Sequence, residues 1–144
     1  MSDDSAINID DTHFPLIYVG YPKPFVDADW KIVCTKLDAL LDRGRPFGWI
    51  NDARTPYFPN ARQRSMLAEQ HKARAADYRR LVPAVAVVST SALVRGIVVA
   101  VEWIHPAPFP HKTFANIADA EAYLRQALNM PPGNAFAMAR GGRA

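Results

Sequence analysis

A short apolar run followed directly by hydroxyl residues constrains this chain more than any other feature. The run from Ala84 to Val88 is rich in valine and is typical of a strand that is buried on both faces of a sheet. Ser89, Thr90 and Ser91 come next, and their hydroxyls suit the N-cap of a helix. The pattern predicts a buried strand that leads into a helix.

The next segment, 92–104, is predicted to be that helix. Its β-branched residues would also suit a strand, but about thirteen residues with Gly96 as the sole turn signal exceed the usual strand length. Arg95 and Glu102 are seven residues apart and fall within about 20° of each other on a helix, while most other positions are apolar. We therefore expect a helix that is buried on nearly all sides, with Gly96 allowing close approach of a neighbouring element.

A proline-rich corner follows this helix and carries several aromatic and histidine side chains. Pro106, Pro108 and Pro110 prevent the helix from continuing. Phe109 lies within the corner, which leads into a strand that ends at Phe114.

The remaining elements are predicted from apolar periodicity and turn signals. We expect a strand pair at 7–10 and 15–21, a helix capped by Asp27, a central strand at 47–51, a long helix over 61–81 after the cap residue Asn60, and a last helix from Asn116 to Leu128. The predicted fold is α/β, with a mixed, mostly parallel five-stranded sheet, about four covering helices and the order ββαβαβαβα. We expect one domain over 1–128 and a flexible C-terminal tail over 129–144.

Length and composition set the class of protein. The 144 residues, 49% of them hydrophobic, suffice for one core, and the single cysteine excludes an intrachain disulfide. No apolar run reaches the length of a membrane span. These features predict a soluble, cytoplasmic protein.

Positive charge is concentrated in the middle of the chain. Nine Arg and Lys face three acids between residues 43 and 81, whereas the whole chain carries a net charge of +3. Such an excess is either a solvated helix face or a surface for an acidic protein, phosphate or nucleic acid. Tyr78 is the one aromatic residue on the basic helix, so any nucleic-acid binding would be nonspecific. The residues expected to bind a protein partner are Arg62, Arg64, Arg74, Tyr57, Phe58 and Phe109.

A second candidate site lies where parallel strands end. Asp52 and Arg54 follow the central strand and, with Arg95, would meet at the carboxyl edge of the sheet. The group is either a structural ion pair or a binding site for an apolar or anionic small molecule. Aromatic residues at element ends, which would otherwise be ordinary core, are candidates to line a cleft there.

Catalytic and metal chemistry have little support. Cys34 has no adjacent histidine, and His105 and His111 lack a third ligand at recognisable spacing. No phosphate-binding or dinucleotide-binding motif is present. We expect no catalytic residue, no metal and no cofactor, although an enzyme would be favoured if either histidine met Asp52 in a cleft.

The run AVAVVSTSALVRGIVVAVEWI, the KTFAN strand and the ADAEAYLRQAL helix resemble the bacterial STAS-like domains, which are similar to anti-sigma-factor antagonists and to lipid-binding Sec14 domains. The resemblance covers roughly Ile7 to Leu128 and lies in apolar patterns rather than in a catalytic signature. It implies a small cytoplasmic domain that binds a protein partner or shelters an apolar ligand, in some members under control of phosphorylation.

One departure from the antagonist pattern affects the expected control by phosphorylation. The family places Asp-Ser after the third strand, whereas this chain has Asp52 followed by Ala53, Arg54 and Thr55, so the matching serine is missing. Ser89, Thr90 and Ser91 lie at a different strand-to-helix junction, where a phosphate would meet free N–H groups. They are candidates for phosphorylation, although capping alone explains them equally well.

These observations favour a non-catalytic regulatory or adaptor domain that binds a protein partner through the basic helix and the aromatic loops. The alternative is a domain that binds a lipid or another apolar or anionic small molecule in a cleft above the sheet. An exposed apolar patch would favour homo-oligomers.

Overall fold

Five strands form one mixed sheet in the computed structural model, which describes residues 7–21, 26–54, 59–104 and 106–141. They are β1 (Asn8–Asp10), β2 (Leu16–Gly20), β3 (Gly48–Asp52), β4 (Val85–Val88) and β5 (His111–Phe114). The pair β1 and β2 is antiparallel, and every other neighbouring pair is parallel. The predicted α/β class with a mostly parallel five-stranded sheet is confirmed.

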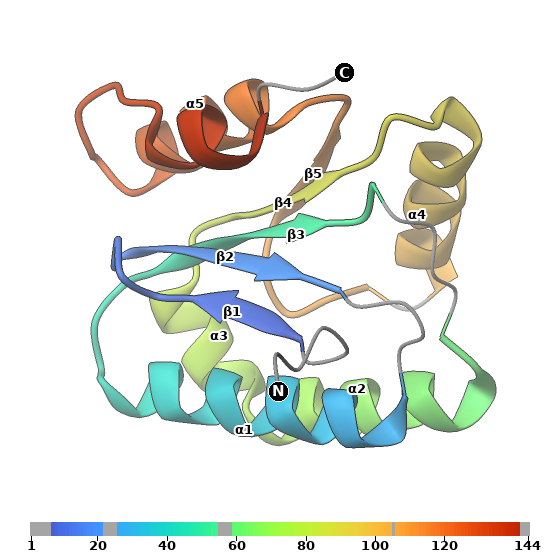
Figure 1. Ribbon diagram of the computed structural model, residues 1–144. Helices are drawn as coiled ribbons and strands as arrows, with labels where there is room; N and C mark the ends of the chain where they lie inside the picture. The colour runs from blue at the N-terminus through green and yellow to red at the C-terminus, as the bar shows by residue number, and fades with distance from the viewer. Residues whose placement is uncertain (1–6, 22–25, 55–58, 105, 142–144) are drawn as a thin grey trace, which may run out of the picture.

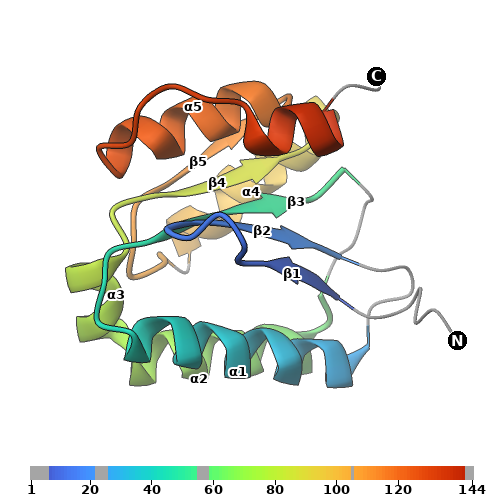
Figure 2. The same ribbon diagram turned by 60° about the vertical axis from the view of Figure 1, so that its left-hand side comes forward.

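The strands lie in the sheet in the same order as in the chain. The crossovers from β2 to β3 and from β3 to β4 therefore step the same way, and right-handed crossovers of this kind place their helices on one face. That face carries α1 (Asp27–Asp42), α2 (Ala61–Ala73) and α3 (Ala75–Leu81), as Figure 1 shows. The opposite face carries α5 (Ile117–Ala127) and the short π-helix η1 (Ala137–Gly141) (Figure 2). The remaining helix, α4 (Ala92–Ile104), packs against the edge strand β5.

Two hydrophobic layers follow from the alternation of side chains along the strands. Ile17, Trp49 and Val85 belong to the layer under α1 and α3, whereas residues one position away belong to the layer under α5. The strands β2, β3 and β4 are therefore apolar on both faces, which the continuous run at 84–88 predicted for β4.

Helix α1 confirms its predicted apolar stripe but has a different cap. The stripe residues are all at least 95% buried: Trp30, Val33, Leu37, Leu40 and Leu41. At the start of the helix the Asp29 carboxylate, rather than that of Asp27, accepts the N–H of Val26 at 2.9 Å. The helix stops before Gly44, whose φ of +67° is a backbone conformation that favours glycine.

The predicted long helix over 61–81 is divided into α2 and α3 at Arg74. The backbone of Arg74 leaves the helical region, with φ −112° and ψ 19°. Its side chain contacts both α1 and α3, so the break is held by polar contacts that periodicity cannot reveal.

Helix α4 confirms the predicted helix, but the predicted burial is wrong. Leu93 is 74% exposed, Val99 48% and Ile97 37%. Because α4 flanks the edge of the sheet, no second layer covers its outer side (Figure 1). An apolar composition predicted burial, but the position of the helix at the margin overrides it.

The expected tail after Leu128 instead packs on the sheet as far as the structure describes it. Phe136 is 1% exposed, and its ring lies 5.7 Å from that of Tyr18 and 5.2 Å from that of His13. The fully buried Glu121 carboxylate accepts the backbone N–H groups of Phe136 and Ala137 at 2.8 and 3.0 Å. This segment covers the β2 side of the α5 face, which α5 alone leaves open.

Candidate functional site

A tyrosine, an aspartate and an arginine meet at the carboxyl edge of the sheet. The Tyr18 hydroxyl donates a hydrogen bond to Asp52 Oδ2 at 2.5 Å. Arg54 donates two hydrogen bonds to the same carboxylate, from Nε to Oδ1 at 2.8 Å and from Nη2 to Oδ2 at 2.7 Å. This is the bidentate geometry that guanidinium groups favour. The parallel register that pairs Gly20 with Asp52 brings the tyrosine, two residues earlier on β2, within reach.

The contacts of this cluster shift its proton affinities. Burial raises the pKa of Asp52, but the hydrogen bonds from Arg54 and Tyr18 outweigh burial, so the net pKa lies below its ordinary value of 3.8. Burial, together with the hydrogen bond to Asp52, raises the pKa of Tyr18 to about 12. At neutral pH the cluster therefore holds a carboxylate, a guanidinium and a neutral phenol.

A second arginine completes the cluster from the C-terminal segment. The Arg140 guanidinium carbon lies 3.9 Å from the centre of the Tyr18 ring, a cation–π contact. Its Nη2 is 3.7 Å from Asp10 Oδ2 on β1. Each cation thus has a carboxylate nearby, so the cluster holds the sheet edge and the C-terminal segment together.

Arg95 does not join Asp52 as predicted. Its Nη1 donates to the backbone oxygen of Ser89 at 2.7 Å, which keeps the guanidinium at the start of its own helix. The structure brings together Asp52 and Arg54 from the predicted group, and places Arg95 in a separate contact.

The three hydroxyl residues differ in exposure. Ser91 Oγ accepts the N–H of Val94 and Ser89 Oγ accepts the N–H of Ser91, both at 3.2 Å, so both act as caps of the turn and of α4. Ser89 is 2% exposed, whereas Thr90 is exposed. Phosphorylation of these residues stays a prediction, with Thr90 the one that an enzyme reaches most easily.

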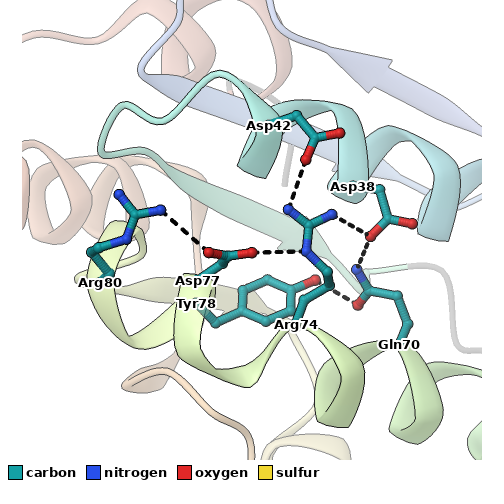
Figure 3. A network of polar contacts seen from close by, with 7 residues as sticks. All are labelled: Asp38, Asp42, Gln70, Arg74, Asp77, Tyr78 and Arg80. Carbon is teal, nitrogen blue, oxygen red and sulfur yellow. Dashed lines mark hydrogen bonds and ion pairs between the residues drawn. The ribbon is translucent and has the colours of Figure 1, made fainter.

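Arg74 is the centre of a polar network between α1, α2 and α3 (Figure 3). Its three nitrogens lie 2.8 to 3.1 Å from the carboxylates of Asp38, Asp42 and Asp77. Gln70 extends the network, since it donates to Asp38 at 3.1 Å and accepts from the buried Tyr78 hydroxyl at 2.6 Å. These contacts hold Arg74 within the fold, and its role on a partner-binding surface stays a prediction.

The other predicted partner residues are divided between surface, core and undescribed loop. Arg62 is exposed, with 80% of its side chain accessible, and Arg64 is exposed and donates to the backbone oxygen of Pro59 at 2.8 Å. Phe109 is only 8% exposed and packs edge-on against Trp49 with ring centres 5.0 Å apart, so it is a core residue. Tyr57 and Phe58 lie outside the described residues.

An apolar cavity of about 60 Å³ lies between the sheet and α1. Trp30, Trp49 and Phe109 line it, and the hydrogen-bonded pair of Tyr21 and Asn51 adds polar groups. A cavity of about 150 Å³ binds benzene, so this smaller one is too small for a lipid chain.

Neither a metal site nor a membrane span is found in the described part of the chain. Among those residues, no three His, Cys, Asp or Glu side chains are grouped as metal ligands. None of the helices in the same residues combines the length and the apolar composition that crossing a bilayer requires.

Sequence reasoning missed Tyr18, Glu121 and Arg140. Glu121 was an ordinary helical acid in the sequence, yet its carboxylate is fully buried and pairs with Arg125 at 2.8 Å. A glutamate on the inner side of the last helix, next to Ala120, was the one available signal.

Comparison with known proteins gives no relative: no family model, no curated protein and no solved structure matches this chain.

Proposed function

We propose that this chain is a non-catalytic adaptor or regulatory domain that binds an acidic protein partner along the exposed sides of α2 and α3. The observation that carries the proposal is a set of exposed basic side chains on these two helices: Arg62, Arg64, Lys72 and Arg79. Within the described residues, Arg64, Lys72 and Arg79 have no carboxylate within ion-pair distance, and Arg62 has only Asp27 at 3.7 Å.

The contrast with Arg74 supports a binding role for the exposed basic side chains rather than for the inner one. Arg74 has three carboxylates, and only 22% of its side chain is accessible. The carboxylates of α1 thus neutralise the inner arginine and leave the outer ones available. Exposed like charges of this kind attract a partner of opposite sign and speed its association.

The engagement of reactive groups inside the fold supports a non-catalytic role. Asp52 is occupied by Tyr18 and Arg54, and Glu121 by Arg125 and two backbone N–H groups. Burial, with a smaller contribution from Asp38, raises the pKa of the Cys34 thiol, so less of the nucleophilic thiolate is present. The alternative, a small-molecule binder, has weaker support because the cavity is too small for a lipid.

The test is capture of a partner from extract of the native cell by the tagged chain. We expect the triple variant Arg64→Glu, Lys72→Glu and Arg79→Glu to keep its circular dichroism spectrum and thermal midpoint, yet to lose the captured protein. The matched control is Lys112→Glu, an exposed basic residue on β5.

The wild-type interaction should weaken as salt rises, because exposed charges are screened within about 8 Å at physiological ionic strength. Equal capture by the triple variant and by wild type would rule out this surface.

A further inference from the structure

Residues 134–141 form a strap that packs on the α5 side of the sheet through two side chains. Phe136 and Arg140 are four residues apart in the sequence, so they lie on the same side of a helical turn. Both contact the ring of Tyr18, Phe136 with ring centres 5.7 Å apart and Arg140 with its guanidinium carbon 3.9 Å from the ring centre. Met138, between them, is exposed. Two anchors on one side of a turn are the arrangement by which helical peptides bind to other proteins.

The surface under the strap also binds its backbone. Glu121 Oε1 accepts the N–H groups of Phe136 and Ala137 at 2.8 and 3.0 Å, contacts that the backbone of any non-proline residue can make. Asp10 Oδ2 lies 3.7 Å from Arg140 Nη2, and the His13 ring packs edge-on against that of Phe136 at 5.2 Å. The strap site therefore consists of Asp10, His13, Tyr18 and Glu121.

The strap site keeps polar partners of its own when the strap is absent. The Tyr18 hydroxyl donates to Asp52, and Glu121 Oε2 accepts a hydrogen bond from Arg125 at 2.8 Å. Glu121 Oε1 exchanges two backbone N–H groups for water, which satisfies a carboxylate oxygen well. Opening of the strap therefore loses mainly the burial of Phe136.

The connection between α5 and the strap runs over the surface. Residues 131–134 are exposed and belong to no helix or strand. Arg125 Nη1 donates to the backbone oxygen of Pro131 at 3.2 Å, and a Cβ at Gly133 would lie 2.6 Å from the Arg125 guanidinium carbon, so glycine permits the close crossing. The strap belongs to no strand of the five-stranded sheet, so its opening leaves the strand pairing intact.

We propose that the strap site is a peptide-binding site and that the strap closes it as an autoinhibitory contact. The partner that fits is a segment of another protein that carries a phenylalanine and, four residues later, an arginine on a helical turn. Its positive charge matches the carboxylates of Asp10 and Glu121. The strap lies on the opposite face of the sheet from α2 and α3, so this proposal is independent of the basic surface (Figure 2).

The test is binding of a fluorescent synthetic peptide, with the sequence of residues 131–144, to the full chain. We expect wild type to bind the peptide weakly, because its own strap occupies the site. The full-length variant Phe136→Ala should bind about 100-fold or more tightly than wild type, because loss of the buried ring opens the strap and raises the fraction of competent sites. Arg140→Ala should shift the affinity in the same direction by a smaller factor. Fluorescence anisotropy measures the affinities, and circular dichroism shows whether each variant is folded.

Matched controls use the exposed Met138. The full-length variant Met138→Ala should bind the peptide as weakly as wild type does. With the chain Phe136→Ala as receptor, a peptide that carries Met138→Ala should bind like the unchanged peptide, whereas a peptide that carries Phe136→Ala should not bind.

Hydrogen exchange of the wild-type chain tests the opening without any substitution. The amides of Phe136 and Ala137 should exchange about tenfold or more faster than the slowest amides of β3, because the strap opens while the sheet stays folded. Three results would overturn the proposal: equal affinity of wild type and Phe136→Ala for the peptide, no binding of the peptide to a folded Phe136→Ala chain, or strap amides that exchange only as slowly as those of β3.

Discussion

Gly20 decides how Tyr18 reaches Asp52. A Cβ at position 20 would lie 2.9 Å from Cε1 of the tyrosine ring, which is closer than real side chains approach. The missing side chain lets the ring lie along the sheet surface, with its hydroxyl at the carboxylate and Arg140 over its face. One glycine thereby allows a buried phenol, a carboxylate and two guanidinium groups to share one edge.

Asp52 should stabilise the fold at neutral pH and lose that effect in acid. Because its folded pKa lies below the ordinary 3.8, its contribution is present above that value and disappears as pH falls through the folded pKa. We expect Asp52→Asn to unfold at lower urea at pH 7, by about 1–3 kcal/mol, with the difference from wild type shrinking below about pH 4.

Tyr18→Phe is the matched control for that experiment. It removes one of the hydrogen bonds to Asp52 but leaves the pair with Arg54, so its cost at pH 7 should be smaller than that of Asp52→Asn. A difference between Asp52→Asn and wild type that stays constant from pH 7 to pH 2 would contradict the assignment.

At the scale of elements, a polar seam accompanies the apolar packing between α1 and the pair α2 and α3. Arg74 ends α2 and is shared among three carboxylates, while Gln63 and Gln70 each donate to an aspartate of α1. The carboxylates of α1 therefore meet the inner side of α2 and the start of α3, while Arg64 and Lys72 lie on the exposed side of α2.

Arg74→Ala should destabilise the protein by about 1–2 kcal/mol, because three partly exposed carboxylates lose a common partner. The loss, measured by urea denaturation, should shrink in high salt, which screens the seam. Arg62→Ala is the control: its carboxylate contact is 3.7 Å and exposed, so the change should be about 0.5 kcal/mol or less. Equal effects of the two substitutions would contradict the central role of Arg74.

Periodicity and caps predicted the helices and strands well, since these depend on neighbouring residues. The buried stripe of α1, the cap by Asn60 and the cap by Asn116 all lie where the pattern placed them. What sequence reasoning missed depends on contacts between distant segments: the break at Arg74, the exposure of α4 and the buried Glu121. Similarly, Asp52 was found because it follows a parallel strand, but no local pattern connects it with Tyr18, 34 residues earlier.

At the scale of the whole molecule, the sequential strand order leaves the two faces of the sheet covered by different sets of elements. Three helices lie under one face, whereas α5 and the segment after it share the other (Figure 2). Phe136 supplies the aromatic side chain that closes the second layer over Tyr18.

Phe136→Ala should therefore cost about 3–5 kcal/mol, the loss expected for a buried aromatic ring. Met138→Ala, two residues away in the same segment, is the control, since Met138 is 76% exposed and its loss should change stability by about 0.5 kcal/mol or less. Urea denaturation followed by circular dichroism measures both. Similar midpoints for the two variants would show that the segment does not belong to the core.

The packing of Phe136 has a consequence for synthesis on the ribosome. All five strands are translated before residue 136 is, and domains generally fold as units. We therefore expect a nascent chain that has not yet presented Phe136 to lack the side chain that covers Tyr18 in the folded protein.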